Sequence, residues 1–194
     1  MIRRQLIAML PIALTMGAAW AKQPVPRTAS ELMIEEPSGK KTQLSKQKGS
    51  VVLVQFLYTN CPHCQATAEV FSKLQKELGP RGLRVLGVAF NEEAGPEGIR
   101  EFVASHHVSF PVGAATRDTV MSYLGISVMS RFVVPQVMVV DRKGIVRAQS
   151  ELMGTAELQD EAYMRSFLEG LLKEGPSTSS LVPKTGSARA SLLH

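Results

Sequence analysis

The stretch VVLVQFLYTNCPHC, residues 51–64, decides the fold class. Its first seven residues, Val51 to Leu57, form a nearly continuous apolar run between Gly49 and the turn-forming pair Thr59-Asn60. Such a run predicts a strand that is buried on both faces of a sheet. A helical pattern begins directly afterwards at Pro62, a residue that the first turn of a helix accommodates. Strand and helix thus meet at two cysteines, which places candidate chemistry at the end of a central strand.

Strand and helix patterns continue to alternate as far as residue 172. A turn at residues 141–144 joins two antiparallel strands, and Thr155 is expected to cap the last helix. Strand, helix and strand, followed by a hairpin and a helix, predict an α/β fold of three layers, with a central mixed sheet and helices on both faces. The predicted strands are 51–57, 83–90, 110–112, 137–140 and 145–149, and the predicted helices are 62–78, 96–106, 118–124 and 155–172.

The N-terminal segment has the three parts of a secretory signal peptide. Arg3 and Arg4 form its positive region, residues 6–18 are uncharged and mostly apolar, and Ala19-Trp20-Ala21 is a small-x-small cleavage site. We therefore expect an exported protein, in the periplasm or another extracytoplasmic space, and both the general secretory and the twin-arginine route fit. The apolar run is shorter than the ~20 residues of a membrane span, so an uncleaved leader that anchors the chain is the alternative.

Four regions are predicted along the chain. Residues 1–21 form the signal peptide, and the Pro-rich, polar residues 22–30 form a linker. Residues 31–173 carry the strand and helix patterns and form one globular domain. Residues 174–194, which are rich in Ser, Thr, Gly and Pro and lack periodicity, are expected to be a disordered tail.

The composition excludes several classes of protein. With 44% hydrophobic and 20% charged residues among 194, it is that of an ordinary globular chain. The net charge is +5, from 22 basic and 17 acidic residues, and without the two arginines of the leader 20 basic residues give +3. That small excess forms no block and predicts no nucleic-acid partner, and we expect a monomer. Two cysteines are too few for a disulfide-stapled scaffold or a four-cysteine metal site.

The candidate chemistry lies in Cys61-Pro62-His63-Cys64. Two cysteines at this spacing in the first turn of a helix can form a disulfide bond. Cys61 then faces unpaired backbone N–H groups and the positive end of the helix dipole, which favour the nucleophilic thiolate. Pro62 suits the first helical position, and we expect His63 to add positive character beside the sulfur and so to make the disulfide more oxidising. Cys64, one turn into the helix, is expected to be less exposed and to resolve mixed disulfides.

Other interpretations of the cysteine pair are weaker. A structural disulfide across so short a loop adds little stability. A zinc site needs two more ligands, so His63, His106 and His107 would have to converge on the cysteines. Covalent haem requires a histidine where Gln65 stands. We therefore predict no metal ligands and no cofactor besides a redox-active Cys61–Cys64 disulfide.

The segment 51–64, with the helix behind it, resembles the thioredoxin superfamily. The lead-in SGKKTQL at residues 38–44 and the helix and strand at 96–110 are similar to the extracytoplasmic TlpA/ResA-like branch, whereas the CPHC motif itself resembles the DsbA oxidases. Over residues 31–173 the resemblance implies a thioredoxin-like three-layer sandwich. It also implies a thiol–disulfide oxidoreductase that exchanges disulfides with protein thiols and has a membrane redox partner.

The resemblance extends to a proline that faces the cysteines in this family. Pro135 directly precedes the predicted strand at 137–140 and matches the cis-proline of the family. The family then implies that the backbone of Val134 pairs with the substrate chain. The resemblance implies that Cys61 attacks a substrate disulfide, or that a substrate thiol attacks Cys61 in the enzyme's own disulfide, and that Cys64 resolves the mixed disulfide. Both directions of electron flow remain open.

Three positions depart from the family pattern. Asn60 stands where a tryptophan commonly precedes the first cysteine, and Gln55 stands where thioredoxin has its buried acid. Thr67 replaces the glutamate that ResA-like proteins place three residues after the second cysteine. Glu69 lies two residues further on, at the wrong angle on the helix to replace it. The group that handles protons near Cys64 is therefore not identified by the resemblance.

Two other activities occur on the same fold. A peroxiredoxin-like peroxidase has Thr or Ser three residues before its cysteine and Pro four residues earlier, but Tyr58 and Val54 stand there. A Sco-like copper chaperone uses two cysteines and a distant histidine, with a cysteine spacing one residue longer than that of Cys61 and Cys64. These remain the alternatives to thiol–disulfide exchange.

Overall fold

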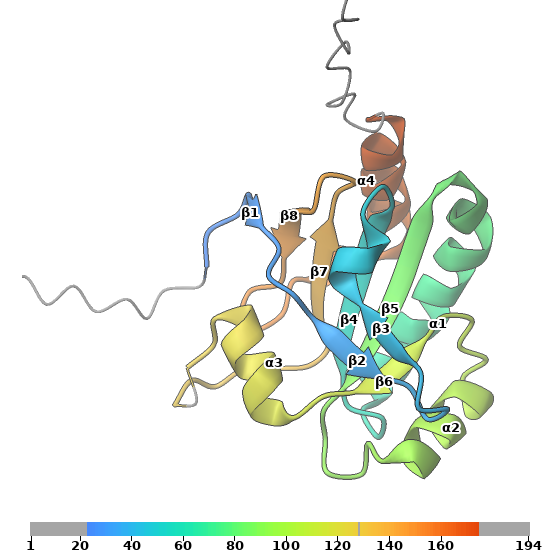
Figure 1. The fold of residues 1–194 in the computed structure, drawn as a ribbon, viewed down its shortest axis with the longest axis vertical. Helices are drawn as coiled ribbons and strands as arrows, with labels where there is room; N and C mark the ends of the chain where they lie inside the picture. The colour runs from blue at the N-terminus through green and yellow to red at the C-terminus, as the bar shows by residue number, and fades with distance from the viewer. Residues whose placement is uncertain (1–22, 128, 175–194) are drawn as a thin grey trace, which may run out of the picture.

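A computed structural model describes residues 23–127 and 129–174 of the chain. The predicted signal peptide and all of the predicted tail except Glu174 lie outside these residues. The fold class is the predicted one, an α/β fold with a central mixed sheet and helices on both of its faces (Figure 1).

The described residues form one eight-stranded sheet in the order β1-β8-β7-β4-β5-β6-β2-β3. The central pairs β4·β5 and β5·β6 are parallel, and the other pairs are antiparallel. Strand β4 lies in the middle of the sheet, between β7 and β5, so its end is surrounded by structure. The strands are β1 Arg27–Thr28, β2 Met33–Glu35, β3 Lys41–Gln43, β4 Val51–Leu57, β5 Leu83–Ala89, β6 Val112–Ala114, β7 Gln136–Val140 and β8 Ile145–Gln149.

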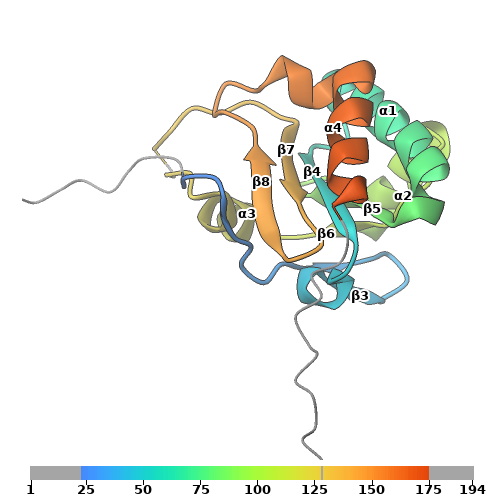
Figure 2. The ribbon, with the colours of Figure 1, turned by 90° about the horizontal axis from the view of Figure 1, so that it is seen from above.

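The helices divide between the two faces of the sheet. The buried residues of α1, α2 and α4 belong to one core cluster on one face of the sheet. Those of α3 belong to a second cluster on the opposite face (Figure 2). The α-helices are α1 Pro62–Leu78, α2 Pro96–Ser105, α3 Arg117–Leu124 and α4 Glu161–Lys173, and short 3-10 helices are η1 Leu44–Gln47, η2 Gly79–Arg81 and η3 Ala156–Gln159.

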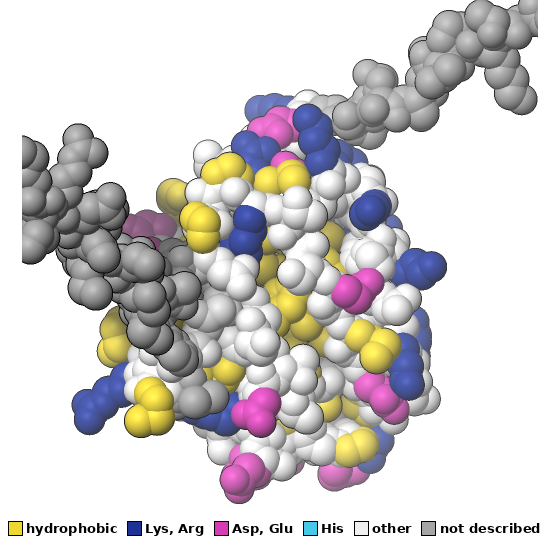
Figure 3. All heavy atoms as spheres, turned by 60° about the vertical axis from the view of Figure 1, so that its left-hand side comes forward, with side chains coloured by type: hydrophobic (Ala, Val, Ile, Leu, Met, Phe, Trp, Pro, Cys, Tyr) yellow, Lys and Arg dark blue, Asp and Glu magenta, His cyan; other side chains and the backbone are white. Residues whose placement is uncertain are grey.

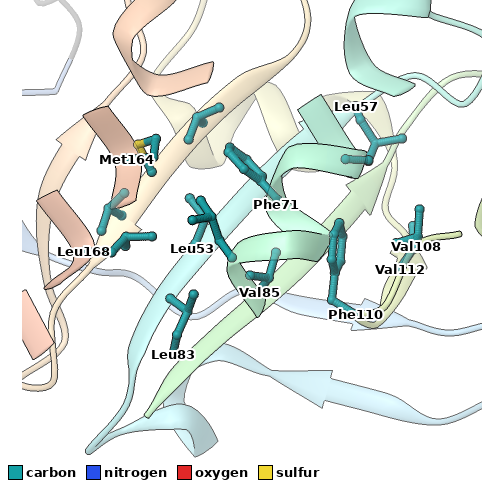
Figure 4. Packing of buried hydrophobic residues seen from close by; sticks show 14 of the residues in the cluster. Leu53, Leu57, Phe71, Leu83, Val85, Val108, Phe110, Val112, Met164 and Leu168 are labelled. Carbon is teal, nitrogen blue, oxygen red and sulfur yellow. The ribbon is translucent and has the colours of Figure 1, made fainter. Parts of the chain in front are cut away.

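Strand β4 is buried along its whole length, which explains its continuous apolar sequence. Leu53 and Leu57 face the cluster beneath α1 and α4, where Leu53 lies near Phe71 (Figure 4), and Val54 and Phe56 face the cluster beneath α3. Each such side chain contributes about 1.5–3 kcal/mol through burial. The end of β4 is therefore a rigid platform for the turn that leads into α1.

On the face shown in Figure 3, lysine, arginine and acidic side chains are interspersed with apolar ones. Among residues 23–127 and 129–174 there is no helix of the length and apolarity that a membrane crossing requires.

The C-terminal part of the domain departs from the sequence prediction. The helix expected at 155–172 is divided, because Asp160 has an extended backbone between η3 and α4. Asp160 Oδ1 accepts a hydrogen bond from Tyr163 N at 2.8 Å and caps α4. Thr155 does not cap a helix, since its hydroxyl accepts from Glu151 N at 3.0 Å. A nearby Asx residue thus replaces the predicted threonine cap.

Two segments before β4 join the sheet. Within the predicted linker, β1 pairs with β8 in the register Arg27↔Val146, so the sheet begins earlier than the predicted domain boundary. The hairpin of β2 and β3 has no clear strand pattern in the sequence and continues the sheet beyond β6. Gly113 allows this contact, because a Cβ there would lie 2.8 Å from Glu35 O. The predicted strand at 110–112 begins only at Val112, since Pro111 has no N–H to donate.

Candidate functional site

Cys61 lies where the central strand meets the long helix. It has an extended backbone, and its N–H donates to Tyr58 O at 3.2 Å, so the turn after β4 ends at this residue. Its Sγ then accepts from Cys64 N at 3.4 Å and caps α1. A sulfur that accepts a backbone N–H at a helix N-terminus is stabilised as an anion by the hydrogen bond and by the helix dipole.

The two cysteines have opposite surroundings. Cys61 is half-buried, whereas Cys64 is fully buried, and both are free thiols in this structure. Burial raises the pKa of Cys64, and its hydrogen bond with Cys61 raises that pKa further. The arrangement therefore offers Cys61 for attack and holds Cys64 behind it as a neutral thiol.

The loop that leads into the neighbouring strand β7 faces Cys61. The Val134–Pro135 peptide is cis, as predicted, and Cys61 Sγ lies 3.9 Å from Val134 O. Pro135 is buried and Val134 is half-buried, and the main chain of Val134 borders the half-buried thiol of Cys61. The structure thus brings Val134 and Pro135 to the cysteine pair, and their role in substrate binding remains a prediction.

Gln136 anchors this loop and was not identified from the sequence. Its Nε2 donates to Val133 O at 2.7 Å and to Glu151 O at 3.2 Å, and Val133 N donates to Leu152 O at 2.9 Å. Gln136 is 1% exposed, although it opens an otherwise apolar strand. An amide directly after the proline, in a segment of valines, was the signal available in the sequence.

Neutral polar groups surround the backbone of the motif where the family has acids. Gln55 Nε2 donates to Cys64 O at 2.8 Å, and Thr67 Oγ1 donates to His63 O at 2.8 Å. The carboxylate of Glu69 pairs with His106 Nδ1 at 3.3 Å rather than with either cysteine. The structure therefore agrees that Glu69 does not replace the missing acid.

The histidines do not gather around the cysteines. The side chain of His63 is exposed, next to Pro62 at the start of α1, and His106 pairs with Glu69 and packs on the Phe102 ring at 5.5 Å. In the part of the chain that the structure describes, no three side chains of His, Cys, Asp or Glu lie close enough together to hold a metal ion.

Comparison with known sequences gives a family match over most of the domain. The model of the AhpC/TSA family matches residues 25–149. The chain is 29% identical over 125 residues to the Thioredoxin-like protein YneN of Bacillus subtilis (strain 168) and 28% identical over 98 residues to the SCO1 protein homolog of the same organism. These alignments cover 61% and 48% of this chain, and they span 66% and 51% of the two relatives.

Comparison with solved structures confirms the thioredoxin-like fold. A thiol:disulfide interchange protein of the thioredoxin family from Chlorobium tepidum TLS superposes with a TM-score of 0.63. The match covers 77% of this chain and 99% of that one, at 21% sequence identity. At that identity the likeness shows the fold, and the activity has to be argued from the residues of the site.

Proposed function

The chain belongs to the AhpC/TSA family, and on that premise we propose that it is a thiol–disulfide oxidoreductase acting through Cys61 and Cys64. The observation that carries the proposal is the pairing of two unlike thiols. Cys61 Sγ caps α1 and lies next to the carbonyl oxygen of half-buried Val134, while Cys64 is buried one turn behind it. Dithiol–disulfide exchange requires such a pair, one thiol to attack and one to resolve.

Exchange proceeds in two steps in which bonds and electrons balance. The Cys61 thiolate attacks one sulfur of a substrate disulfide, whose S–S bond breaks, and the departing thiolate takes up a proton. Cys64 then loses its proton to solvent and attacks Cys61 Sγ, the bond between Cys61 and the substrate sulfur breaks, and the second substrate thiolate leaves and takes up a proton from solvent. The substrate gains two electrons and two protons, and the enzyme keeps a Cys61–Cys64 disulfide. The same steps in reverse oxidise a substrate dithiol.

Several features beyond the cysteines belong to this proposal. The main chain of Val134 lies where an extended substrate segment would pair with it, and Gln136 holds that loop in place. Pro62 fits the helix start, and the positive character of His63 favours the thiolate and so a more oxidising disulfide. No bound cofactor is needed, because the disulfide itself carries the electrons.

We also propose that the protein acts outside the cytoplasm and exchanges electrons with a membrane redox partner. The support is the signal-peptide pattern of residues 1–21, which ends in a small-x-small site at Ala21. Cell fractionation and the mass of the mature N-terminus test this part. Recovery of an unprocessed chain from the cytoplasm would overturn it.

Trapping of mixed disulfides tests the role of each cysteine. Cys64→Ala is expected to retain partner proteins on Cys61 through a bond that a reductant releases, because the resolving thiol is gone. Cys61→Ala is the matched control and is expected to retain none. Equal trapping by the two variants, or by neither, would overturn the assignment.

Copper binding is a second candidate, which the match to the SCO1 protein homolog favours. Titration of the reduced protein with Cu(I) separates the two functions. Tight, stoichiometric binding that depends on a histidine would support copper delivery, whereas rapid exchange with disulfides and weak copper binding would support the oxidoreductase. Peroxide consumption measured on the same sample tests the peroxidase alternative.

A further inference from the structure

A cavity of about 470 Å³ lies on the side of α3, next to the loop residue Val134 that contacts Cys61. We call it the Arg117 cavity, and the walls that matter here are Tyr58, Arg117, Arg131, Phe132, Val134 and Met153. Tyr58 lies three residues before Cys61, and Val134 is the residue whose carbonyl oxygen is 3.9 Å from Cys61 Sγ. The cavity therefore continues the reactive site along the loop that faces it.

Aromatic contacts hold the Arg117 side chain at this cavity. Its Nη1 donates to Tyr58 Oη at 2.7 Å, and its guanidinium carbon lies 5.1 Å from the centre of the Phe132 ring. Both rings pack on Phe90, at 4.7 Å from Tyr58 and 6.3 Å from Phe132 between ring centres. A cation–π contact and a hydrogen bond to a hydroxyl position the guanidinium and leave its charge in place.

Within the described part of the chain, the two arginines of the cavity have no acidic partner. None of the ion pairs among residues 23–127 and 129–174 includes Arg117 or Arg131. Among the other described arginines, Arg81, Arg100 and Arg165 each pair with a glutamate, whereas Arg27, Arg84 and Arg142 bond to neutral groups instead. The cavity thus presents two arginines without an ion-pair partner among the described residues, and it shares Val134 with the surroundings of Cys61.

The opposite side of Cys61 carries negative charge. A second cavity of about 390 Å³ there is lined by Asn60 and by the glutamates Glu93 and Glu101. The side-chain amide of Asn91 donates to Glu93 at 2.9 Å and holds the pKa of Glu93 below its usual range. A substrate chain that crosses Cys61 would therefore meet positive charge on the α3 side and negative charge on the α2 side. This difference in charge would favour one orientation of the chain.

Resting on the proposed function, we propose that the Arg117 cavity binds an acidic side chain of the substrate polypeptide, next to its reactive cysteine. Arginine recognises carboxylates through parallel N–H···O bonds, and a guanidinium already positioned by rings loses little freedom on binding. The rings and the exposed Met153 offer apolar contact to the stem of Glu or Asp. The substrate class is thus an extended protein segment with Asp or Glu beside its cysteine, on the side that reaches α3.

Exchange with matched peptide disulfides tests this inference. Three peptides that differ only in one residue beside the cysteine, Glu, Gln or Lys, are reacted with the full reduced chain, and second-order rate constants are compared. We expect the Glu peptide to react roughly three- to tenfold faster than the Gln peptide, and the ratio to fall toward one at high salt. A ratio of one at low salt would overturn the inference, while slow exchange with all three peptides would overturn the proposed function itself.

Charge variants locate the effect. Arg117→Gln and Arg131→Gln are each expected to lower the Glu-to-Gln rate ratio, and Arg117→Glu is expected to favour the Lys peptide. Arg84→Gln is the matched control, because Arg84 is an exposed arginine at the other end of the sheet, and its ratio is expected to equal that of the wild type. An unchanged ratio in both cavity variants, or an equal loss in the control, would overturn the assignment of the cavity.

Discussion

The start of α1 and the loop at residues 133–136 face each other across 3.9 Å, yet different interactions hold them. The helix start is fixed by contacts within a few residues, since Cys61 makes hydrogen bonds with the backbone of Tyr58 and of Cys64. The loop is fixed by residues far away in sequence, because Gln136 bonds to the carbonyl oxygen of Glu151. The reacting atoms are thus placed by local sequence, and the surface opposite them is placed by the tertiary fold.

The largest expected effect comes from the helix side. Cys61→Ser is expected to abolish exchange, since a serine hydroxyl cannot form the mixed disulfide. Cys64→Ser is expected to form mixed disulfides at a rate near that of the wild type but to release them slowly. Quenched-flow measurement with a peptide disulfide checks both variants, and appreciable turnover by Cys61→Ser would contradict the assigned role of Cys61.

The loop side is expected to combine loss of stability with loss of activity. Gln136→Leu leaves buried carbonyl oxygens of the loop without their amide donor, which costs about 1–3 kcal/mol of unfolding free energy. We also expect slower exchange, because Val134 is no longer held opposite Cys61. Urea unfolding and exchange rates measure the two effects.

Gln149→Leu is the matched control for this variant. Gln149 is also a buried amide, and it donates to Leu124 O at 3.0 Å, away from the cysteines. We expect a similar loss of stability with unchanged exchange rates. If both variants slowed exchange equally, general destabilisation would explain the result and the contrast between helix and loop would not hold.

The sequence predicts the bounds of the main strands and helices better than it predicts the interactions that hold the loop at residues 133–136. The helix Pro62–Leu78 and the strand Val51–Leu57 match their predicted bounds, because burial and helix-stopping residues act locally. The hairpin of β2 and β3 escaped prediction, since three-residue strands have little pattern of their own. Gln136 escaped for another reason, because its partners at residues 151–152 are visible only once the chain is folded.

The pH dependence of the unfolding free energy reports on the buried thiol of Cys64. Because burial raises the pKa of Cys64 in the folded protein, the folded state keeps this proton when the unfolded state loses it. The stabilisation that Cys64 gives to the folded state is fully present below the unfolded pKa of about 8.5. Above that pH, the free energy of unfolding falls by about 1.4 kcal/mol per pH unit. Unfolding of the reduced wild type against Cys64→Ala measures the slope, and equal slopes in the two proteins would contradict a raised pKa.

The smallest expected effect concerns His63. Replacing it by proline removes positive character beside Cys61, and we expect the disulfide to become less oxidising. A tenfold change in the equilibrium constant of exchange would correspond to a shift of about 30 mV in the reduction potential. His106→Pro is unsuitable as a control because it would alter the end of α2, so His107→Gln serves, at a histidine outside the site. A potential unchanged by His63→Pro would favour a TlpA-like reductase.

The central claim is that Cys61 and Cys64 form one reversible redox centre. The most direct test is a titration of the full chain against glutathione or dithiothreitol, with the free thiols alkylated and counted by mass. We predict a single two-electron transition in which both thiols disappear together and return together. Independent modification of the two cysteines, with no intramolecular disulfide at any potential, would contradict it.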